Sequence, residues 1–218
     1  MGFTGGNNAG IRFALNQNDC DFLWLLNNDT VVEKNTLSEM LAVAKSGKKI
    51  GITGSKLMDY DTPQKIQALG GNINTSFGQT HHLLSEKALD KLNYIIGASF
   101  LISKECLERI GFLDENFFLY NEDCDYCLTA QSHGFKISVA LASVVYHKEG
   151  GSSANLFRDY YGIRNTVYLG QKHFNPLFTT LYAISRIIKR MFLFRWKAAR
   201  IGIKAVIDCW AGRMGRIY

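Results

Sequence analysis

The strongest constraint on the fold is an apolar run that stops abruptly at three polar residues. Residues 22–32 read Phe-Leu-Trp-Leu-Leu-Asn-Asn-Asp-Thr-Val-Val. The apolar half predicts a buried strand with Asn27, Asn28 and Asp29 at its carboxyl end, where open α/β sheets bind their ligands. A carboxylate beside two amides suits Mg²⁺ or Mn²⁺, which take few protein oxygens and add phosphate and water. The alternative is that Asp29 or Thr30 caps the next helix.

The rest of the chain alternates strand-like and helix-like segments, which predicts an α/β sheet. Strands are expected at 22–26, 50–58, 94–103 and 136–146, and helices at 11–16, 34–46, 104–110 and 123–133. Residues 2–10 are rich in glycine and asparagine and predict a loop, although they contain neither a dinucleotide fingerprint nor a P-loop. Residues 59–92 predict hairpins or a long loop, and residues 147–153 a further loop.

Five scattered cysteines indicate a reducing compartment, because their number is odd and their spacing gives no disulfide framework. Cys124 and Cys127 form a C-x-x-C pair, which is found in zinc and redox sites. No second pair accompanies them, and acidic residues surround them. Two small residues on one helix are therefore the better interpretation.

Three acids, Glu122, Asp123 and Asp125, follow the aromatic run 117–120 at the start of a predicted helix. Acids in a first turn complement the helix dipole, which accounts for one or two of them. Crowding and burial raise the pKa of a carboxyl group, and such a group can act as a general base near neutral pH. For this group of acids, a role as general base is favoured over a role limited to capping the helix.

His147 follows an apolar strand directly and precedes Gly150 and Gly151. A lone histidine at a strand end is more often structural than a ligand. Its functional interpretation depends on Asp29 lying nearby, which the sequence does not determine.

Taken together, these segments resemble a family 2 glycosyltransferase of the GT-A fold, and most closely the bacterial rhamnosyltransferase-like and galactofuranosyltransferase-like enzymes of surface polysaccharide synthesis. The matching pieces occur in order along the chain. They are Gly2-Phe3-x-Gly5-Gly6-Asn7-Asn8-x-Gly10, Leu25-Leu26-Asn27-Asn28-Asp29-Thr30, Gly97-Ala98-x-Phe100-Leu101-Ile102, Gly111-Phe112-x-Asp114-Glu115-x-Phe117-Phe118, Glu122-Asp123-x-Asp125-Tyr126, Tyr146-His147 and Tyr160-Tyr161-x-x-Arg164-Asn165.

The resemblance implies a role for each matching position. Asp123 matches the general base, and Glu122 the residue that positions the acceptor or tunes that base. Asp29 and His147 match ligands of a divalent cation, Mn²⁺ or Mg²⁺, on the donor diphosphate. Asn27 departs from the acidic D-x-D pattern. The resemblance further implies donor-binding residues and acceptor-side residues. The donor-binding set is Gly5, Gly6, Asn7, Asn8, Asn27, Asn28 and Asp29, and the acceptor-side set is Tyr120, Asp125, Gly97 and Ala98.

The implied reaction is metal-dependent transfer, with inversion, from a nucleotide-diphospho-sugar to a hydroxyl of a saccharide, expected to be lipid-linked. The family begins with a strand, a helix and a strand upstream of the Gly-Phe-x-Gly-Gly segment, and Met1 stands at that segment here. The sequence therefore predicts a donor site lacking its first portion and a sheet with an exposed edge. The alternative is an inactive fragment or a binding module that needs a partner.

The positive charge of the chain is concentrated at its carboxyl end, and the remainder carries a slight acidic excess. Nine basic residues and one acid, Asp208, fall within 177–218. Apolar residues alternate with them, which predicts a basic amphipathic helical tail (166–218) after a glycosyltransferase domain (1–165). We expect this tail to lie on the anionic cytoplasmic face of the bacterial plasma membrane, with no nucleic acid partner. The alternative is an ordinary helix packed on the domain.

Overall fold

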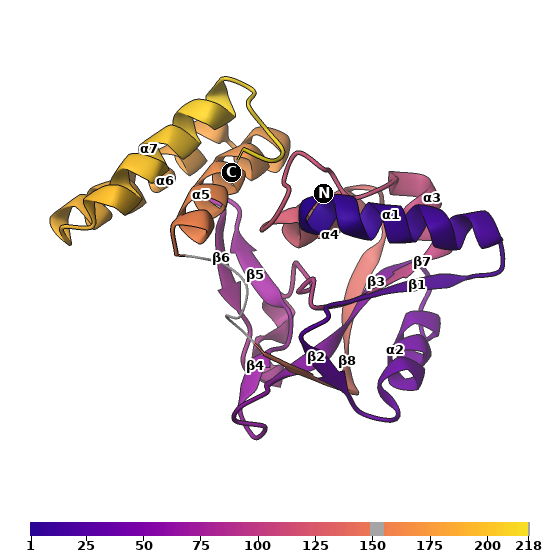
Figure 1. The fold of residues 1–218 in the computed structure, drawn as a ribbon. Coiled ribbons are helices and arrows are strands. Elements are labelled where there is room, and N and C mark those ends of the chain that lie inside the picture. Colours follow the sequence, from indigo (N-terminus) through magenta and orange to yellow (C-terminus); the bar gives the residue numbers. More distant parts are fainter. Residues whose placement is uncertain (149–154, 218) are drawn as a thin grey trace.

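The computed structural model describes residues 1–148 and 155–217 and contains a mixed sheet with helices on both faces and a helical region beside it (Figure 1). The elements follow the chain in this order: α1 (Gly2–Gln17), β1 (Phe22–Leu26), β2 (Thr30–Val32), α2 (Thr36–Lys45), β3 (Ile50–Asp59), β4 (Ile66–Ala68), β5 (Gly71–Asn74), β6 (Gln79–His82), the 3₁₀ helix η1 (Glu86–Lys91), β7 (Ser99–Ser103), α3 (Lys104–Ile110), α4 (Glu122–Ser132), β8 (Lys136–His147), α5 (Asn155–His173), α6 (Pro176–Phe192) and α7 (Trp196–Trp210).

The main sheet has the strand order β1-β7-β3-β8-β2, and β4 pairs with β3 outside this path. Only β3 and β8 run parallel among its described pairs, and the others are antiparallel. β5 and β6 form a separate hairpin. The predicted α/β class and most predicted elements are confirmed. The strand predicted at 94–103 is shorter, because residues 94–98 leave the ladder and pass beside the start of α4.

The prediction of a loop at the glycine-rich residues 2–10 is wrong, since residues 2–17 form helix α1. Its buried residues Thr4, Asn8 and Ile11 recur at helical spacing and face the body of the protein. Two hydrogen bonds to the backbone of Leu113 fix Asn8 there. Nδ2 of Asn8 donates to the carbonyl oxygen of Leu113 at 2.8 Å, and the N–H of Leu113 donates to Oδ1 of Asn8 at 3.0 Å. Tertiary contacts therefore outweigh the low helix propensity of glycine.

Two apolar clusters cover the two faces of the sheet. The larger lies under α3 and α4 and includes Phe100, Phe117 and Tyr126, all buried. On the other face α2 inserts Met40 and Ala44 against β7 and β8. Burial of these side chains fixes which face of each strand points inward.

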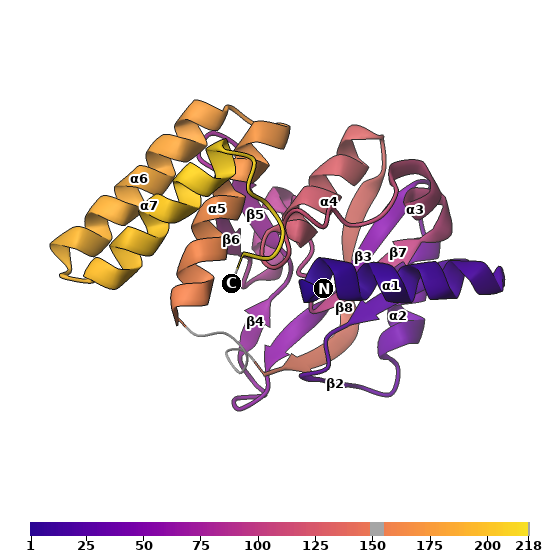
Figure 2. The ribbon, with the colours of Figure 1, turned by 45° about the horizontal axis from the view of Figure 1, so that its top comes forward.

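The helical region has a core of its own and is joined to the sheet through α5. Tyr160, Tyr161 and Ile163 of α5 pack with residues of α6 and α7, which lie side by side and extend away from the sheet (Figure 2). Asp208, the sole acid within residues 177–218, is buried and accepts hydrogen bonds from Tyr160, Lys204 and Arg213. The boundary predicted after residue 165 falls within α5.

Candidate functional site

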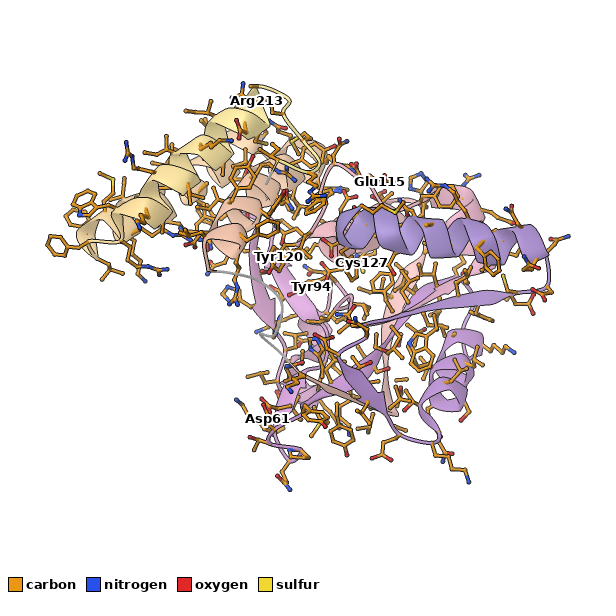
Figure 3. All side chains as sticks on the ribbon, viewed as in Figure 1. Asp61, Tyr94, Glu115, Tyr120, Cys127 and Arg213 are labelled. Atoms are coloured by element: carbon orange, nitrogen blue, oxygen red, sulfur yellow. The ribbon has the colours of Figure 1, made fainter. Side chains whose placement is uncertain are left out.

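A pocket of about 460 Å³ opens at the carboxyl ends of β1 and β8, where they meet β4, β6 and the start of α4. Tyr94 and Tyr120 line it at the junction of the sheet and the helical region (Figure 3). The full lining comprises Phe3, Asn27, Asn28, Asp29, Gln67, Thr80, His82, Tyr94, Ile96, Leu119, Tyr120, Asn121, Glu122, Asp123, Cys124, His147 and Arg158. The pocket thus brings together residues of three predicted motifs.

The short strand β2 is what places Asp29 beside His147. Thr30 pairs with His147 across β2 and β8, and the backbone N–H of Lys148 donates to the carbonyl oxygen of Asp29 at 3.0 Å. Oδ1 of Asp29 lies 3.4 Å from Nε2 of His147. The alternative that Asp29 or Thr30 caps a helix is wrong, because α2 begins after Asn35.

Gln67 determines which nitrogen of His147 faces Asp29. The Gln67 side chain donates from Nε2 to the carbonyl oxygen of His147 at 3.4 Å, so its Oε1 faces the ring and lies 2.8 Å from Nδ1. Nδ1 therefore carries the proton in the neutral ring, and Nε2 presents a lone pair to Asp29.

These groups fit a divalent cation. Oδ1 of Asp29 is buried and has no hydrogen-bond partner among the described residues. A carboxylate oxygen and an imidazole lone pair that face each other repel, whereas a cation between them binds both. The described residues contain no group of three or more His, Cys, Asp or Glu suited to a metal. Phosphate and water would therefore supply the remaining ligands, as Mg²⁺ sites generally require.

The acid pair at the start of α4 forms the opposite side of the pocket. Asp123 accepts hydrogen bonds from the backbone N–H of Gly97 at 3.0 Å and of Cys124 at 2.8 Å. Burial raises the pKa of Asp123, and these two bonds oppose that effect. Glu122 is 6% exposed, and no hydrogen-bond partner for its Oε2 is found in the described chain. Burial and the charge of Asp123 raise the pKa of Glu122 well above its ordinary value, so Asp123 is the member of the pair that ionises first.

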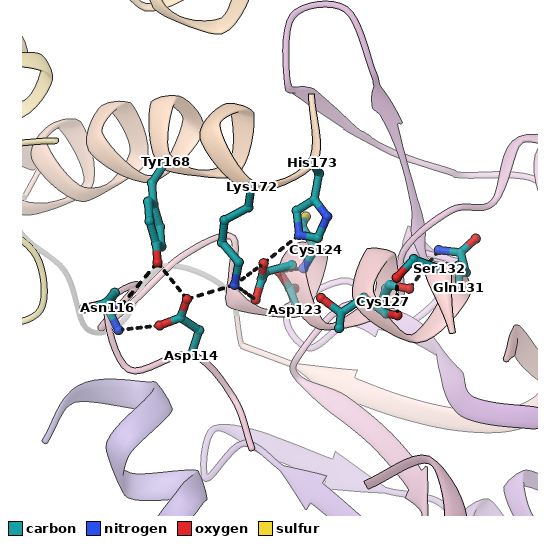
Figure 4. A network of polar contacts seen from close by, with 12 residues as sticks. Asp114, Asn116, Asp123, Cys124, Cys127, Gln131, Ser132, Tyr168, Lys172 and His173 are labelled. Atoms are coloured by element: carbon teal, nitrogen blue, oxygen red, sulfur yellow. Dashed lines mark hydrogen bonds and ion pairs between the residues drawn. The ribbon is translucent and has the colours of Figure 1, made fainter. Parts of the chain in front are cut away.

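Asp125, predicted on the acceptor side, does not line the pocket. Two residues along a helix turn the side chain by about 200°, so Asp125 points away from Asp123. It is 4% exposed and pairs with Lys172 at 2.8 Å and His173 at 2.7 Å. Lys172 also reaches Asp114 at 2.8 Å, so this network joins α4 to α5 (Figure 4).

A strained turn holds the acid pair in position. Phe118, Tyr120 and Asn121 have φ values of 63°, 71° and 66°, a region that residues other than glycine rarely adopt. Asn165 of α5 donates from Nδ2 to three carbonyl oxygens of this turn at 2.7–2.9 Å. Arg164 donates from Nε to Oδ1 of Asn165, which fixes the amide orientation. Strain of this kind persists where the surroundings determine the backbone, as here beside the pocket.

Further bonds from Arg164 complete this clamp. Its Nη2 donates to the carbonyl oxygens of Asn116 and Phe117 at 2.8 Å, and its Nη1 donates to that of Gly215 at 2.7 Å. Arg164 and Asn165 are both fully buried. The motif Tyr160-Tyr161-x-x-Arg164-Asn165 thus acts on the pocket through the turn and not by lining it.

Replacement of Asn165 should destabilise the chain through these carbonyl groups. Asn165→Ala should lower the free energy of unfolding by about 2–3 kcal/mol, because it leaves buried acceptors without donors. Asn165→Asp should cost more, although it is isosteric, because a carboxylate would face three carbonyl oxygens. Urea unfolding of both variants measures the difference. A smaller cost for Asp than for Ala would show that the shape of the side chain, and not its donated hydrogen bonds, matters at this position.

The predicted donor-binding residues divide into two groups. Asn27, Asn28 and Asp29 line the pocket, whereas Gly5, Gly6, Asn7 and Asn8 lie within α1 outside its lining, and only Phe3 of that segment reaches it. Asn7 donates to the carbonyl oxygen of Phe3. Gly97 and Ala98 act through their backbones: Gly97 bonds Asp123, and Ala98 accepts from the N–H of Asn27.

Sequence reasoning missed Gln67, His82 and Arg158, which also line the pocket. Gln67 and His82 lie in the segment predicted as hairpins or a loop, where no pattern marks them. Arg158 stands two residues before the motif that begins at Tyr160, and no sequence pattern marks it as a site residue. The predicted loop residues 149–153 lie outside the described residues.

Both α4 cysteines are buried, and burial raises the pKa of the Cys124 and Cys127 thiols well above its ordinary value. Such thiols are poor nucleophiles and poor metal ligands. This agrees with the interpretation of the C-x-x-C pair as two small residues on a helix.

Comparison with curated proteins finds hexose-transferring relatives. The chain is 28% identical over 144 residues to a low-salt glycan biosynthesis hexosyltransferase of Haloferax volcanii (62% of this chain, 45% of the relative). It is 23% identical to the dTDP-rhamnosyl transferase RfbF of Shigella flexneri (83% and 63%) and 19% identical to the galactofuranosyltransferase GlfT2 of Mycobacterium tuberculosis (97% and 38%). The chain therefore spans about half the length of these relatives.

Solved structures with a similar fold are nucleotide-sugar transferases of the GT-A type. GalNAc-T7 with UDP, GalNAc and Mn²⁺ aligns with a TM-score of 0.55 at 16% identity, over 79% of this chain and 41% of that one. A mannosyltransferase from Pyrobaculum calidifontis in complex with GDP-Man and Mn²⁺ aligns with a TM-score of 0.51 at 12% identity, over 96% of this chain and 55% of that one. The predicted GT-A fold is thereby confirmed.

The family assignment rests on the match of sequence motifs over most of the chain. Residues 2–161 match glycosyltransferase-like family 2, and the relatives named above include a rhamnosyltransferase and a galactofuranosyltransferase. The chain belongs to glycosyltransferase family 2, in its rhamnosyltransferase-like and galactofuranosyltransferase-like subgroup.

Proposed function

We propose that this chain carries the catalytic site of an inverting, metal-dependent glycosyltransferase. Its donor is a nucleotide-diphospho-sugar and its acceptor a hydroxyl group of a lipid-linked saccharide. The observation that carries the proposal is that one pocket is lined by two pairs of side chains with different chemistry. The Asp29–His147 pair suits a cation, and the Glu122–Asp123 pair contains a carboxylate with a raised pKa.

Asp123 is the proposed general base. Its carboxylate takes the proton from the acceptor hydroxyl while that oxygen bonds to the anomeric carbon and the bond from this carbon to the diphosphate breaks. The nucleoside diphosphate leaves with the bonding electron pair. Two backbone N–H groups, from Gly97 and Cys124, hold the carboxylate in one orientation.

Glu122 holds its proton to a higher pH than an exposed glutamate does, because burial and the charge of Asp123 raise its pKa well above the ordinary value. A neutral carboxyl group can hydrogen-bond the acceptor without adding a second negative charge beside Asp123. We therefore assign Glu122 to acceptor positioning.

The leaving diphosphate needs positive charge near Asp29. A divalent cation bound by Asp29 and His147 would neutralise the charge that develops on the diphosphate. Arg158, on the exposed side of α5, also lines the pocket and adds a permanent positive charge. We propose that Arg158 contacts the donor phosphates.

The proposal is tested by transfer itself. The chain with Mn²⁺ is incubated with UDP-, GDP- and dTDP-sugars and lipid-linked saccharides, and the anomeric configuration of the product is read by NMR. We expect one donor to give product with inverted configuration. Nucleotide binding without transfer or hydrolysis, across all donors, would instead favour a partner-dependent binding module.

Loss of Gln67 should weaken cation binding. In Gln67→Ala the proton of His147 is no longer fixed on Nδ1, and the Mn²⁺ affinity should fall by about 10–100-fold, as for other partners that orient a metal ligand. Electron paramagnetic resonance titration of free Mn²⁺ measures this without turnover. Gln64→Ala, an exposed change in the same segment, is the matched control. Equal Mn²⁺ affinity in the two variants would exclude the orienting role.

The proposed location is the cytoplasmic face of the plasma membrane, where lipid-linked acceptors are exposed. The basic, partly apolar helices α6 and α7 support this placement. Within the described ranges, no helix has the length and apolar character needed to cross a membrane. We propose that α6 and α7 attach the chain peripherally.

A further inference from the structure

The turn between α6 and α7 exposes an unusual run of apolar side chains. All residues from 191 to 197 are exposed, and Phe192 and Phe194 are 80% and 79% exposed. Met191, Leu193 and Trp196 complete the apolar part of this run. The turn lies at the end of the two helices farthest from the sheet (Figures 1 and 2). Neighbouring elements therefore do not account for these side chains.

The backbone does not account for Phe194 either. Its φ is 54°, in the left-handed region that follows a helix, where glycine is the common residue. The N–H of Phe194 donates to the carbonyl oxygen of Met191, and that of Arg195 to the carbonyl oxygen of Arg190. A phenylalanine at this position costs backbone strain and gains little packing, which points to a role outside the folded chain.

An apolar stripe on α6 leads to this turn. Leu177, Leu181, Ile184 and Ile188 are exposed and recur at spacings of four, three and four residues, which is one face of the helix. The opposite face is buried against the rest of the helical region. The alternative of an ordinary helix packed on the domain thus describes only one face of α6.

Basic side chains beside the turn are exposed and can bind anions. Lys189, Lys197 and Arg200 are exposed, whereas the buried Arg190 pairs with Asp159. In the described part of 176–217 the only acid is Asp208, and it is buried. The exposed surface near the turn is therefore apolar and positive, without exposed acids of its own helices.

We propose that residues 191–197, which we name the aromatic turn, insert into the headgroup region of an anionic lipid bilayer. Aromatic rings at such a boundary bury their apolar parts, and nearby cations meet the anionic headgroups. A second copy of the chain fits the aromatic turn less well, because it would bring like charges together. This inference deepens the peripheral placement proposed above, and its test does not use transfer, so the two can fail separately.

The test compares binding of the full chain to vesicles of neutral phosphatidylcholine and of phosphatidylcholine with one quarter phosphatidylglycerol. We expect binding to the anionic vesicles that weakens as salt is raised. Phe194→Gly relieves the backbone strain while it removes the ring, so it should keep the fold. It should weaken binding by about tenfold, and Phe192→Ser with Phe194→Gly by about a hundredfold.

Matched controls lie at the far side of the molecule. Phe13→Ser removes a 70% exposed phenylalanine from α1, and Lys48→Glu reverses an exposed charge after α2. Both should bind vesicles as the parent chain does, whereas Lys197→Glu should bind more weakly. Equal binding of the Phe192/Phe194 double variant and the parent would overturn the proposal. The proposal would also be overturned if the parent chain did not bind vesicles but formed a dimer in sedimentation, and the double variant abolished that dimer.

Discussion

Replacement of Asp123 by asparagine should lower turnover by about 10²–10⁴-fold, the usual loss when a general base is removed. Asparagine keeps the shape of the side chain, so the bonds from Gly97 and Cys124 can be retained in part. Donor affinity, measured by calorimetry, should change little, because Asp123 acts on the acceptor. Single-turnover kinetics at saturating donor measure the chemical step. Near-normal turnover would remove Asp123 from this role.

The same experiment separates Asp123 from Glu122. Because burial raises the pKa of Asp123, turnover of the parent chain should rise with pH through a range above that of an exposed aspartate. Glu122→Gln mimics the protonated form and should keep most of the activity.

The stability of the Glu122→Gln variant should also differ in its pH dependence. With a raised pKa in the folded state, Glu122 holds a proton that the unfolded chain releases, so the free energy of unfolding falls as pH rises from the ordinary glutamate pKa to the raised one. The glutamine variant should show a smaller fall in urea unfolding between pH 4.5 and 8. Reversed roles would instead appear as an inactive Glu122→Gln variant beside an active Asp123→Asn variant.

Removal of divalent cations should abolish transfer, and Mn²⁺ or Mg²⁺ should restore it. Asp29→Asn removes the charge from the buried Oδ1 position while keeping its shape. Mn²⁺ affinity should then fall by more than about 100-fold, beyond the loss expected for a residue that only orients a ligand. Titration of Mn²⁺ in the absence of donor measures binding apart from turnover.

Asp59→Asn provides the control for that experiment. Asp59 stands opposite His147 in the β3–β8 register, but its carboxylate accepts from the N–H groups of Asp61 and Thr62 outside the pocket. Because Asp59 lies outside the pocket, this change of carboxylate to amide should leave the Mn²⁺ affinity of the chain unaltered. Full transfer in excess chelator would exclude the metal requirement.

Elements with strong local patterns were predictable from sequence, whereas elements ordered mainly by contacts with distant residues were not. The strand at 22–26 and the helix ending at Gly111 follow from apolar runs and a capping glycine. β2 contains three residues and is ordered by pairing with β8, so local sequence does not mark it. Helix α1 depends on contacts more than 100 residues away, such as Asn8 with Leu113.

The chemistry of the candidate site was predictable from sequence, but the full set of residues that line it was not. Asp29, His147, Glu122 and Asp123 line one pocket, as the resemblance implies. The different orientation of Asp125 followed from helical geometry alone, since residues two apart do not share a face. Gln67 could not be found in the sequence, because its importance comes from the pairing of β4 with β3 beside His147.

The carboxyl end of the described chain returns to the clamp beside the pocket. Gly215 donates to the carbonyl oxygen of Asn116 and accepts from Arg164, so the end of α7 is fixed to the turn that carries the acid pair. The aromatic turn lies at the other end of α7, whose 15 residues span about 22 Å. With the aromatic turn inserted in a bilayer as we propose, the helix would act as a rigid spacer that limits the height of the pocket above the bilayer. It would then restrict acceptors by the distance between their lipid and their reactive hydroxyl group.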